Sequence, residues 1–333
     1  MKFQDILSIF YDNWTIKGNV LECQKFDNGS PNDVWKIKCS EGCYVLKKCK
    51  LDVENDWYKI QHLYLEKWKS EGIPVSMPIL TKNNNNVANV SGELYQLYGF
   101  VEGERYQLNK INMLRQVALL TTELHSVECD DSDQKSAFND LELWLQYPKE
   151  NLENLKITLL NLETSNLDIN EYLKEVEDNL YFAQASLSYE TYMSLPRALT
   201  HGELHHTNII FKDNKLKCLI DFDSIQVRPR IYDIARASLF LSRKRRGEFV
   251  VNEKFVYEFL QVYCQNSKLT KEEFNGISII LLYYFMPTAS YVKKMAKSEK
   301  LSWYLPWTLK GMRYVKNEFT SIVENNLRRV LLK

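Results

Sequence analysis

Short runs in which apolar and polar residues alternate fill most of the first hundred positions. Residues 34–39 (Val-Trp-Lys-Ile-Lys-Cys) alternate, a Glu-Gly turn follows, and residues 44–47 (Tyr-Val-Leu-Lys) continue the pattern, which predicts a β-hairpin. Further strands are predicted at 76–80, 86–90 and 93–101. Helices are predicted for the amphipathic opening residues and for 56–71, which ends at Gly72-Ile73-Pro74.

Helical spacing replaces the alternation from about Leu108 onward. The predicted helices cover residues 113–127, 141–147, 169–187, 189–194, 233–246 and 253–265, with long helical stretches to the end. A strand–turn–strand segment at 198–222 is the exception, and polar residues gather in it. A strand-rich first part and a helical second part predict an α+β protein of two lobes, with the ligand cleft between them.

Composition narrows the function classes. Lysine plus arginine equals aspartate plus glutamate at 43 each, so no net charge favours nucleic acid or an anionic membrane as a partner. The longest uncharged apolar run, 277–292, is shorter than the roughly twenty residues that cross a bilayer, and a buried core helix is predicted there. The start lacks a secretory signal and the seven cysteines are scattered, which favours a cytoplasmic protein with reduced thiols.

The segment 201–211 (His-Gly-Glu-Leu-His-His-Thr-Asn-Ile-Ile-Phe) carries the candidate chemistry. Glu203 precedes Asn208 by five positions, and Asp221 follows Asn208 by thirteen, directly after an apolar run. A hairpin of that length can bring Asn208 and Asp221 together at one end. Oxygen ligands of this kind suit Mg²⁺, and phosphoryl transfer needs such a metal, a carboxylate that orients the nucleophile and a cation on the nucleotide phosphates.

These motifs resemble the signature of the aminoglycoside phosphotransferase and choline kinase-like family. The resemblance rests on His-Gly-Glu-Leu-His-x-x-Asn at 201–208, Ile-Asp at 220–221 and Tyr-Asp-Ile-Ala at 232–235. Five further segments also resemble parts of the family's structure. They are the nucleotide loop at 28–35, the lysine strand at 44–47, the helix break at 72–75, the interlobe hinge at 98–103 and the end of the first large-lobe helix at 124–125. Within the family, the length and the hinge resemble the bacterial spore-coat CotS group.

The resemblance implies a protein-kinase-like fold, with a nucleotide-binding lobe at 1–99 and a catalytic and acceptor-binding lobe at 100–333. It implies ATP, or another nucleoside triphosphate, and Mg²⁺ as cofactors, with a small-molecule hydroxyl as the acceptor. The implied roles are as follows: Lys47 holds the α/β-phosphates, Gly29 and Ser30 cover the nucleotide, the backbone around Tyr98 and Phe100 meets the adenine, Asn208 and Asp221 ligate Mg²⁺, Glu203 orients the acceptor hydroxyl, His201 braces the catalytic loop and Asp233 ties it down.

Two positions depart from the family pattern. Glu203 stands where the family usually has aspartate, and the extra methylene extends the carboxylate by about 1.5 Å. A displacement near 1 Å can cost roughly 10²-fold in rate, so impaired or retuned activity is one prediction. Gln61 stands where a glutamate normally pairs with the lysine. It can accept a hydrogen bond from Lys47 but supplies no charge, and His62 or Glu66 are alternatives.

Rival hypotheses remain open at this point. The main alternative is a catalytically weak or inactive kinase-like component of a spore coat, with structural or binding partners there. A protein kinase is disfavoured because the His-Arg-Asp and Asp-Phe-Gly patterns are absent. The aromatic residues Trp303, Tyr304 and Trp307 either fill the core or line an acceptor pocket. The basic run 243–246 is interpreted as a solvated helix end.

Overall fold

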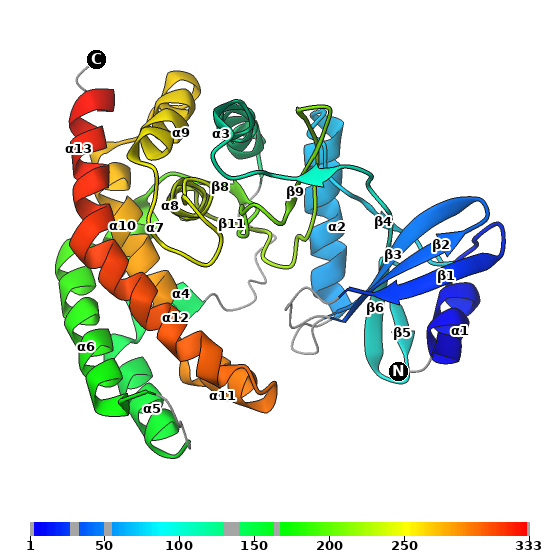
Figure 1. The fold of residues 1–333 in the computed structure, drawn as a ribbon, viewed down its shortest axis with the longest axis horizontal. Coiled ribbons are helices and arrows are strands. Elements are labelled where there is room, and N and C mark those ends of the chain that lie inside the picture. Colours follow the sequence, from blue (N-terminus) through cyan, green and yellow to red (C-terminus); the bar gives the residue numbers. More distant parts are fainter. Residues whose placement is uncertain (1–2, 27–32, 50–54, 130–139, 163–166, 332–333) are drawn as a thin grey trace. The chain divides into compact units, whose positions relative to one another are not determined.

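The computed structural model describes residues 3–26, 33–49, 55–129, 140–162 and 167–331. The chain forms two compact units (Figure 1). The first comprises residues 1–105, 209–213 and 217–222, and the second comprises 106–208, 214–216 and 223–333. Gly29 and Ser30, which the sequence assigns to a nucleotide-covering loop, lie outside the described residues.

An antiparallel sheet forms the centre of the first unit. Its strands are β1 (Val20–Lys25), β2 (Val34–Cys39), β3 (Gly42–Lys48), β4 (Pro78–Ile79), β5 (Ala88–Val90) and β6 (Glu93–Gly99). Their order is β1-β2-β3-β6-β4, and β5 pairs with β6. The β2–β3 hairpin predicted from the alternation is confirmed, with Val34 opposite Lys47 in its register.

The core of this unit lies between the sheet and helix α1 (Phe3–Asn13). Alternate β2 residues, Trp35 and Ile37, are buried together with Phe10 of α1 and with Trp14, which follows that helix. Because every second strand residue points to the same face, the alternation in the sequence becomes one continuous apolar layer. Helix α2 (Asn55–Ser70) ends two residues before Gly72, whose φ of +81° suits a residue without a Cβ.

The first unit also contains β7 (Glu104–Arg105) and β9 (Ile209–Lys212), which pair antiparallel. Gly103 makes this pairing possible, since a Cβ there would lie 2.2 Å from the carbonyl oxygen of Phe211. Strand β9 is followed by β10 (Lys215–Leu219) across a two-residue turn, Asp213-Asn214, in which both φ angles are positive. Such angles are typical of the turn that joins a tight hairpin.

Helices dominate the second unit. They are α3 (Ile111–Ser126), α4 (Asp140–Gln146), α5 (Pro148–Leu160), α6 (Ile169–Ser186), α7 (Tyr189–Ser194), α8 (Ile231–Phe240), α9 (Glu253–Asn266), α10 (Lys271–Phe285), α11 (Ala289–Lys297), α12 (Leu301–Tyr314), the π-helical turn η2 (Val315–Phe319) and α13 (Thr320–Leu331). Every residue of α8 is buried, and most of α10 is buried as well. These two helices pack on each other. Both helices are mostly apolar in sequence because most of their residues are buried in the core of the unit.

A short two-stranded sheet completes the second unit. Strand β8 (Arg197–Thr200) pairs antiparallel with β11 (Gln226–Pro229), with Thr200 opposite Gln226. The sequence did not predict β11, and it treated 198–222 as one strand–turn–strand segment. Strand β8, which precedes the polar motif, instead pairs with β11, which follows Asp221 and Ser224. The candidate site residues from 201 to 224 therefore lie in the chain between these two paired strands.

Two helix predictions are wrong in extent. The predicted helix 233–246 ends at Phe240 in α8, and Arg243 is buried instead of solvated at a helix end. Its guanidinium lies 5.0 Å from the Phe240 ring, and burial lowers the pKa of Arg243 to about 10. The apolar run 277–292 is divided between α10 and α11 because Pro287 cannot continue the first helix. Within the described ranges, no helix combines the length and the apolar character needed to span a membrane.

Candidate active site

The loop 201–208 between β8 and β9 is tied to the first turn of α8. The backbone N–H groups of His201 and Gly202 each donate a hydrogen bond of 2.7 Å to the carboxylate of Asp233. Asp233 is fully buried, and His125 Nε2 lies 3.4 Å from its Oδ2. Burial alone would raise the pKa of Asp233, but the hydrogen bond and charge of His125, with the charges of His201 and Arg228, hold it below its usual value. An ionised carboxylate therefore anchors the loop.

His201 supports the same loop from inside. Its side chain is fully buried, and its Nδ1 accepts a hydrogen bond of 3.2 Å from the backbone N–H of Glu203. The contact orients the residue that carries the candidate catalytic carboxylate. This is the kind of contact that the bracing role assigned to His201 requires.

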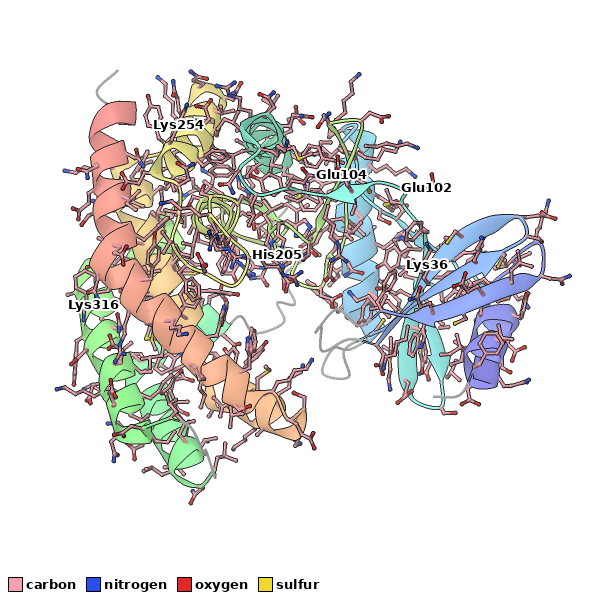
Figure 2. The ribbon with its side chains drawn as sticks, viewed as in Figure 1. Lys36, Glu102, Glu104, His205, Lys254 and Lys316 are labelled. Atoms are coloured by element: carbon pink, nitrogen blue, oxygen red, sulfur yellow. The ribbon has the colours of Figure 1, made fainter. Side chains whose placement is uncertain are left out.

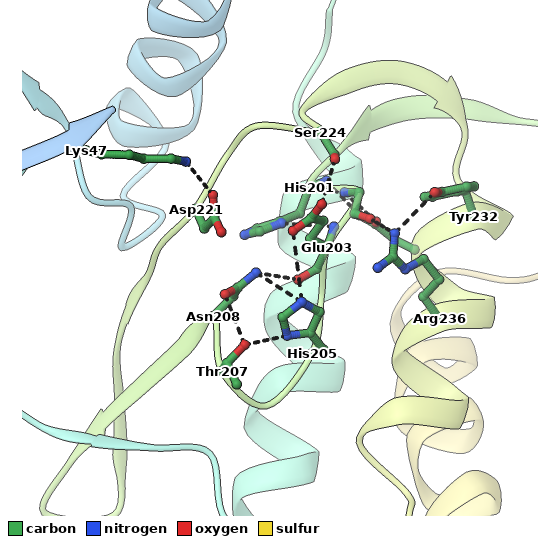
Figure 3. A network of polar contacts seen from close by, with 12 residues as sticks. Lys47, His201, Glu203, His205, Thr207, Asn208, Asp221, Ser224, Tyr232 and Arg236 are labelled. Carbon is green, nitrogen blue, oxygen red and sulfur yellow. Dashed lines mark hydrogen bonds and ion pairs between the residues drawn. The ribbon is translucent and has the colours of Figure 1, made fainter. Parts of the chain in front are cut away.

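The Glu203 side chain is partly exposed, with 24% of its surface accessible. Its Oε1 accepts a hydrogen bond of 3.0 Å from Ser224 Oγ, and its Oε2 lies 4.0 Å from His205 Nε2 (Figure 3). Behind it, Arg236 donates a hydrogen bond of 2.5 Å to the Gly202 carbonyl oxygen. The carboxylate is thus fixed through one oxygen, while the other lies beyond hydrogen-bonding distance of its nearest imidazole.

Asn208 closes the loop. It is buried, and its Nδ2 donates to the Glu203 carbonyl oxygen at 3.1 Å. Its Oδ1 accepts a hydrogen bond of 3.3 Å from Thr207, and Thr207 Oγ1 also lies 2.8 Å from His205 Nδ1 (Figure 3). The contacts hold the amide in a set orientation immediately before β9 begins.

Lys47 and Asp221 meet in the first unit, although 174 residues separate them in the chain. Lys47 Nζ donates to Asp221 Oδ1 at 2.7 Å, and the side chains are 10% and 32% exposed. Asp221 has a φ of +66°, a left-handed conformation that costs free energy in a residue with a side chain and that clusters at functional sites. Backbone hydrogen bonds of Leu219 to Pro74 and Ser76 hold the segment that leads into it.

Gln61 is bound to other partners than Lys47. Its Oε1 accepts a hydrogen bond from Gln96 at 2.9 Å, and its Nε2 donates to the Phe222 carbonyl oxygen at 2.9 Å. Gln96 in turn accepts from the hydroxyl of Tyr98 at 2.9 Å. The sequence allowed a hydrogen bond from Lys47 to Gln61. Among the described residues, Gln61 instead belongs to a buried network of uncharged groups next to the Asp221 segment.

The predicted hinge residues lie at the end of β6. Tyr98 pairs with Val45 in the sheet register, and the backbone N–H of Phe100 donates to the Cys43 carbonyl oxygen at 2.8 Å. The Phe100 ring lies 4.1 Å from the Lys36 ammonium, a cation–π contact (Figure 2 labels Lys36). Tyr98 thus belongs to the same sheet that presents Lys47, and Phe100 follows β6 directly and is bound to β3 through its backbone N–H.

Aromatic residues of α10, α11 and α12 form a connected cluster in the second unit. The ring of Trp307 lies 5.6 Å from Trp303, 6.1 Å from Tyr304 and 6.3 Å from Tyr284. Trp303 is 61% exposed, whereas Tyr304 is only 8% exposed. Burial raises the pKa of Tyr284 to about 12, and the charge of Glu203 adds to the increase. Tyr304 therefore belongs to the core, whereas Trp303 presents an exposed aromatic surface.

Sequence reasoning missed three residues of the site. Ser224 donates a hydrogen bond to the Glu203 carboxylate, and Arg236 donates one to the loop backbone. Gln96 donates a hydrogen bond to the side chain of Gln61. Arg236 carries a signal in the sequence, since it is a charged residue in the otherwise apolar run of α8. Gln96 has a weaker one, as a polar residue at a buried strand position opposite Lys47. Ser224 has none.

Residues 22–266 match the family model of the "Phosphotransferase enzyme family". The chain belongs to this family. It is 20% identical over 217 residues to a homoserine kinase from Bartonella tribocorum (strain CIP 105476 / IBS 506), a match that covers 65% of the chain and 63% of that kinase. The chain thus matches less than two thirds of this relative's length.

Solved structures of two phosphotransferases share the fold. A microcompartment-associated aminopropanol kinase superposes with a TM-score of 0.73 at 13% identity, covering 96% of the chain and 98% of that structure. A spectinomycin phosphotransferase in complex with ADP and spectinomycin gives a TM-score of 0.68 at 12% identity, covering 98% of each chain. The predicted protein-kinase-like α+β fold and the predicted family are confirmed.

Proposed function

We propose that this protein transfers the γ-phosphoryl group of ATP to a hydroxyl of a small molecule in the presence of Mg²⁺. The observation that carries the proposal is the ion pair of 2.7 Å between Lys47 and Asp221. The ion pair joins Lys47, which is assigned to the nucleotide phosphates, to Asp221, which is assigned to the metal. Membership of the phosphotransferase family, together with the structural similarity to a spectinomycin phosphotransferase solved with ADP, supports the use of a nucleotide.

Each residue has one task in this proposal. Lys47 binds the α/β-phosphates, and the backbone around Tyr98 and Phe100 meets the adenine. Asn208 and Asp221 hold Mg²⁺, and the amide and carboxylate oxygens that they offer are ligands that this ion accepts. The bound ion neutralises phosphate charge. We propose a nucleotide lobe at 1–99 and a lobe for the catalytic loop and the acceptor at 100–333, and the compact unit that contains Lys47 also includes residues 209–213 and 217–222.

Glu203 acts on the acceptor. Its carboxylate orients the hydroxyl, the hydroxyl oxygen bonds to the γ-phosphorus, the bond from that phosphorus to the bridging oxygen breaks, and ADP leaves. The hydroxyl proton passes to Glu203. His201 and Asp233 hold the loop so that these groups keep their orientation, and such positioning accounts for most of the catalysis of phosphoryl transfer.

Mg²⁺-dependent ATP binding tests the proposal, with Asp221→Asn as the variant. Asparagine tolerates the left-handed backbone of residue 221, so the change removes the charge and keeps the conformation. Calorimetry should find that wild-type protein binds ATP more tightly with Mg²⁺ than with EDTA, and that this difference disappears in the variant. Asp12→Asn, an exposed position of α1, is the matched control. A folded wild type that binds no ATP under either condition would refute the kinase interpretation.

The acceptor is proposed to be a small hydroxylated amine. Homoserine, aminopropanol and spectinomycin, named in the relatives' descriptions, all carry hydroxyl and amino groups. The aromatic cluster and the negative charge of Glu203 are the chemistry that attracts an ammonium group.

Trp303→Ala is accordingly expected to raise the acceptor KM severalfold and to leave MgATP affinity unchanged. Trp303 presents the largest exposed aromatic surface of the cluster, and loss of a cation–π partner at an exposed site is worth about 0.5–1 kcal/mol. Steady-state kinetics with each of the three amines measures the effect. Tyr181→Ala, at an exposed tyrosine of α6, is the control, and equal acceptor KM values for both variants would contradict the acceptor assignment.

The second candidate is a binding or structural role in a spore coat with little or no turnover. The neutral Gln61–Gln96 pair favours it, because no charge at residue 61 assists Lys47. The spore-coat partners follow from the resemblance to the CotS group. Nucleotide binding without transfer to any hydroxylated acceptor would support this role over the enzyme.

A further inference from the structure

Ser224 lies in the turn between Asp221 and β11, and its hydroxyl reaches the catalytic loop. Ser224 Oγ donates to Glu203 Oε1 at 3.0 Å (Figure 3). In the part of the chain that the structure describes, this is the one hydrogen bond made to the Glu203 carboxylate. The oxygen that remains, Oε2, is 4.0 Å from His205 Nε2.

The two backbones are held so close that the contact is built into the fold. Gly202 has a φ of +78°, and a Cβ there would lie 2.4 Å from the Ser224 carbonyl oxygen. Only glycine allows this approach without displacing the Ser224 segment. The position of Ser224 beside Glu203 therefore depends on backbone packing as well as on the side-chain hydrogen bond.

Two buried arginines fix these segments from behind. Arg236 donates to the Gly202 carbonyl oxygen, and Arg228 donates to the Ser224 carbonyl oxygen. Their guanidinium carbons lie 5.6 and 4.3 Å from the centroid of the same ring, that of Tyr232. Both arginines are at least nine-tenths buried. Each segment is therefore bound by a buried arginine, and both arginines pack near the Tyr232 ring.

We propose that Ser224 is the positioning residue for the Glu203 carboxylate. This inference rests on the proposed function. An aspartate at residue 203 would end one methylene short, about 1.5 Å, and would leave the Ser224 hydroxyl beyond reach. The serine binds Oε1 of the longer side chain, sets its rotation and leaves Oε2 for the acceptor hydroxyl. Glu203, which replaces the usual aspartate, and Ser224, which lies three residues after Asp221, thus form one functional pair.

A double-mutant cycle tests the pair. Ser224→Ala should lower kcat about 10- to 100-fold while the KM for MgATP stays unchanged, and Ser224→Thr, which keeps the hydroxyl, should restore most of the rate. In a Glu203→Asp background, Ser224→Ala should have no further effect. The acceptor is whichever of homoserine, aminopropanol or spectinomycin gives ADP release, or water if none does. Ser238→Ala, which removes a buried hydroxyl bonded to the Ala235 carbonyl oxygen, is the control.

Thermal unfolding of the wild type, Ser224→Ala, Glu203→Asp and the double variant, without nucleotide, separates this inference from the proposed function. The midpoint shifts of Ser224→Ala and Glu203→Asp should be non-additive because both remove one contact. Non-additive midpoints without any phosphoryl transfer would support the contact and refute the proposed function. Additive midpoints, an equal loss of kcat in both backgrounds, or no rescue by threonine would overturn the role of Ser224.

Discussion

Glu203→Gln should reduce kcat by about 10²- to 10⁴-fold, the usual contribution of a positioned general base. Glutamine has nearly the same shape and can still accept the hydrogen bond from Ser224, but it cannot take the acceptor proton. Lys47 and Asp221 are untouched, so MgATP affinity should remain close to that of the wild type. Coupled ADP-release kinetics and calorimetry on one preparation measure the two quantities.

Glu102→Gln is the matched control for this variant. Its side chain is 80% exposed and lies 3.7 Å from Lys212 in a surface ion pair (Figure 2 labels Glu102), an arrangement of small energetic value. It should leave both kcat and MgATP affinity unchanged. Wild-type kcat in Glu203→Gln would show that residue 203 is not the general base, whereas parallel losses of kcat and affinity would indicate a damaged loop.

The fold was largely predictable because local patterns determine most of it. Strand 34–39 and helix 189–194 have the bounds that alternation and helical spacing predicted. Strand β11 was missed because its residues Gln226–Pro229 are all buried and include two that are polar, so no alternation marks them. Lys244, Arg245 and Arg246 are exposed as predicted, but Arg243 was misinterpreted because sequence alone does not reveal that it packs on Phe240.

The residues of the candidate site can be proposed from the sequence where one short segment contains them. The spacing of Glu203, Asn208 and Asp221 is readable from the sequence, and so is the lysine at the end of an apolar strand. Contacts between distant segments are not. Ser224 lies 21 residues from Glu203, and Gln96 lies 35 residues from Gln61. The pairing of β8 with β11 brings the segments of the first pair together, and a hydrogen bond between α2 and β6 joins the second pair.

Asp233→Asn should destabilise the second unit by about 2 to 4 kcal/mol at neutral pH. The fully buried carboxylate accepts hydrogen bonds of 2.7 Å from the N–H groups of both His201 and Gly202. An asparagine offers one acceptor oxygen, and its NH₂ group then faces a second donor. The loop would lose an anchor. Urea unfolding, with Asp178→Asn at an exposed position of α6 as control, measures the change.

The effect should depend on pH in one direction. Because the pKa of Asp233 is held below its usual value in the folded protein, the carboxylate adds stability that is complete above the unfolded pKa of about 3.9. That stability is lost as the pH falls through the lower folded pKa. The difference between wild type and Asp233→Asn should therefore be constant from pH 7 to about 5 and shrink below about 4. A difference that stays constant in acid, or that grows, would show that the anchor is not an ionised carboxylate, and the loop carrying Glu203 would then depend on its other contacts, among them the hydrogen bond from Arg236 to the Gly202 carbonyl oxygen.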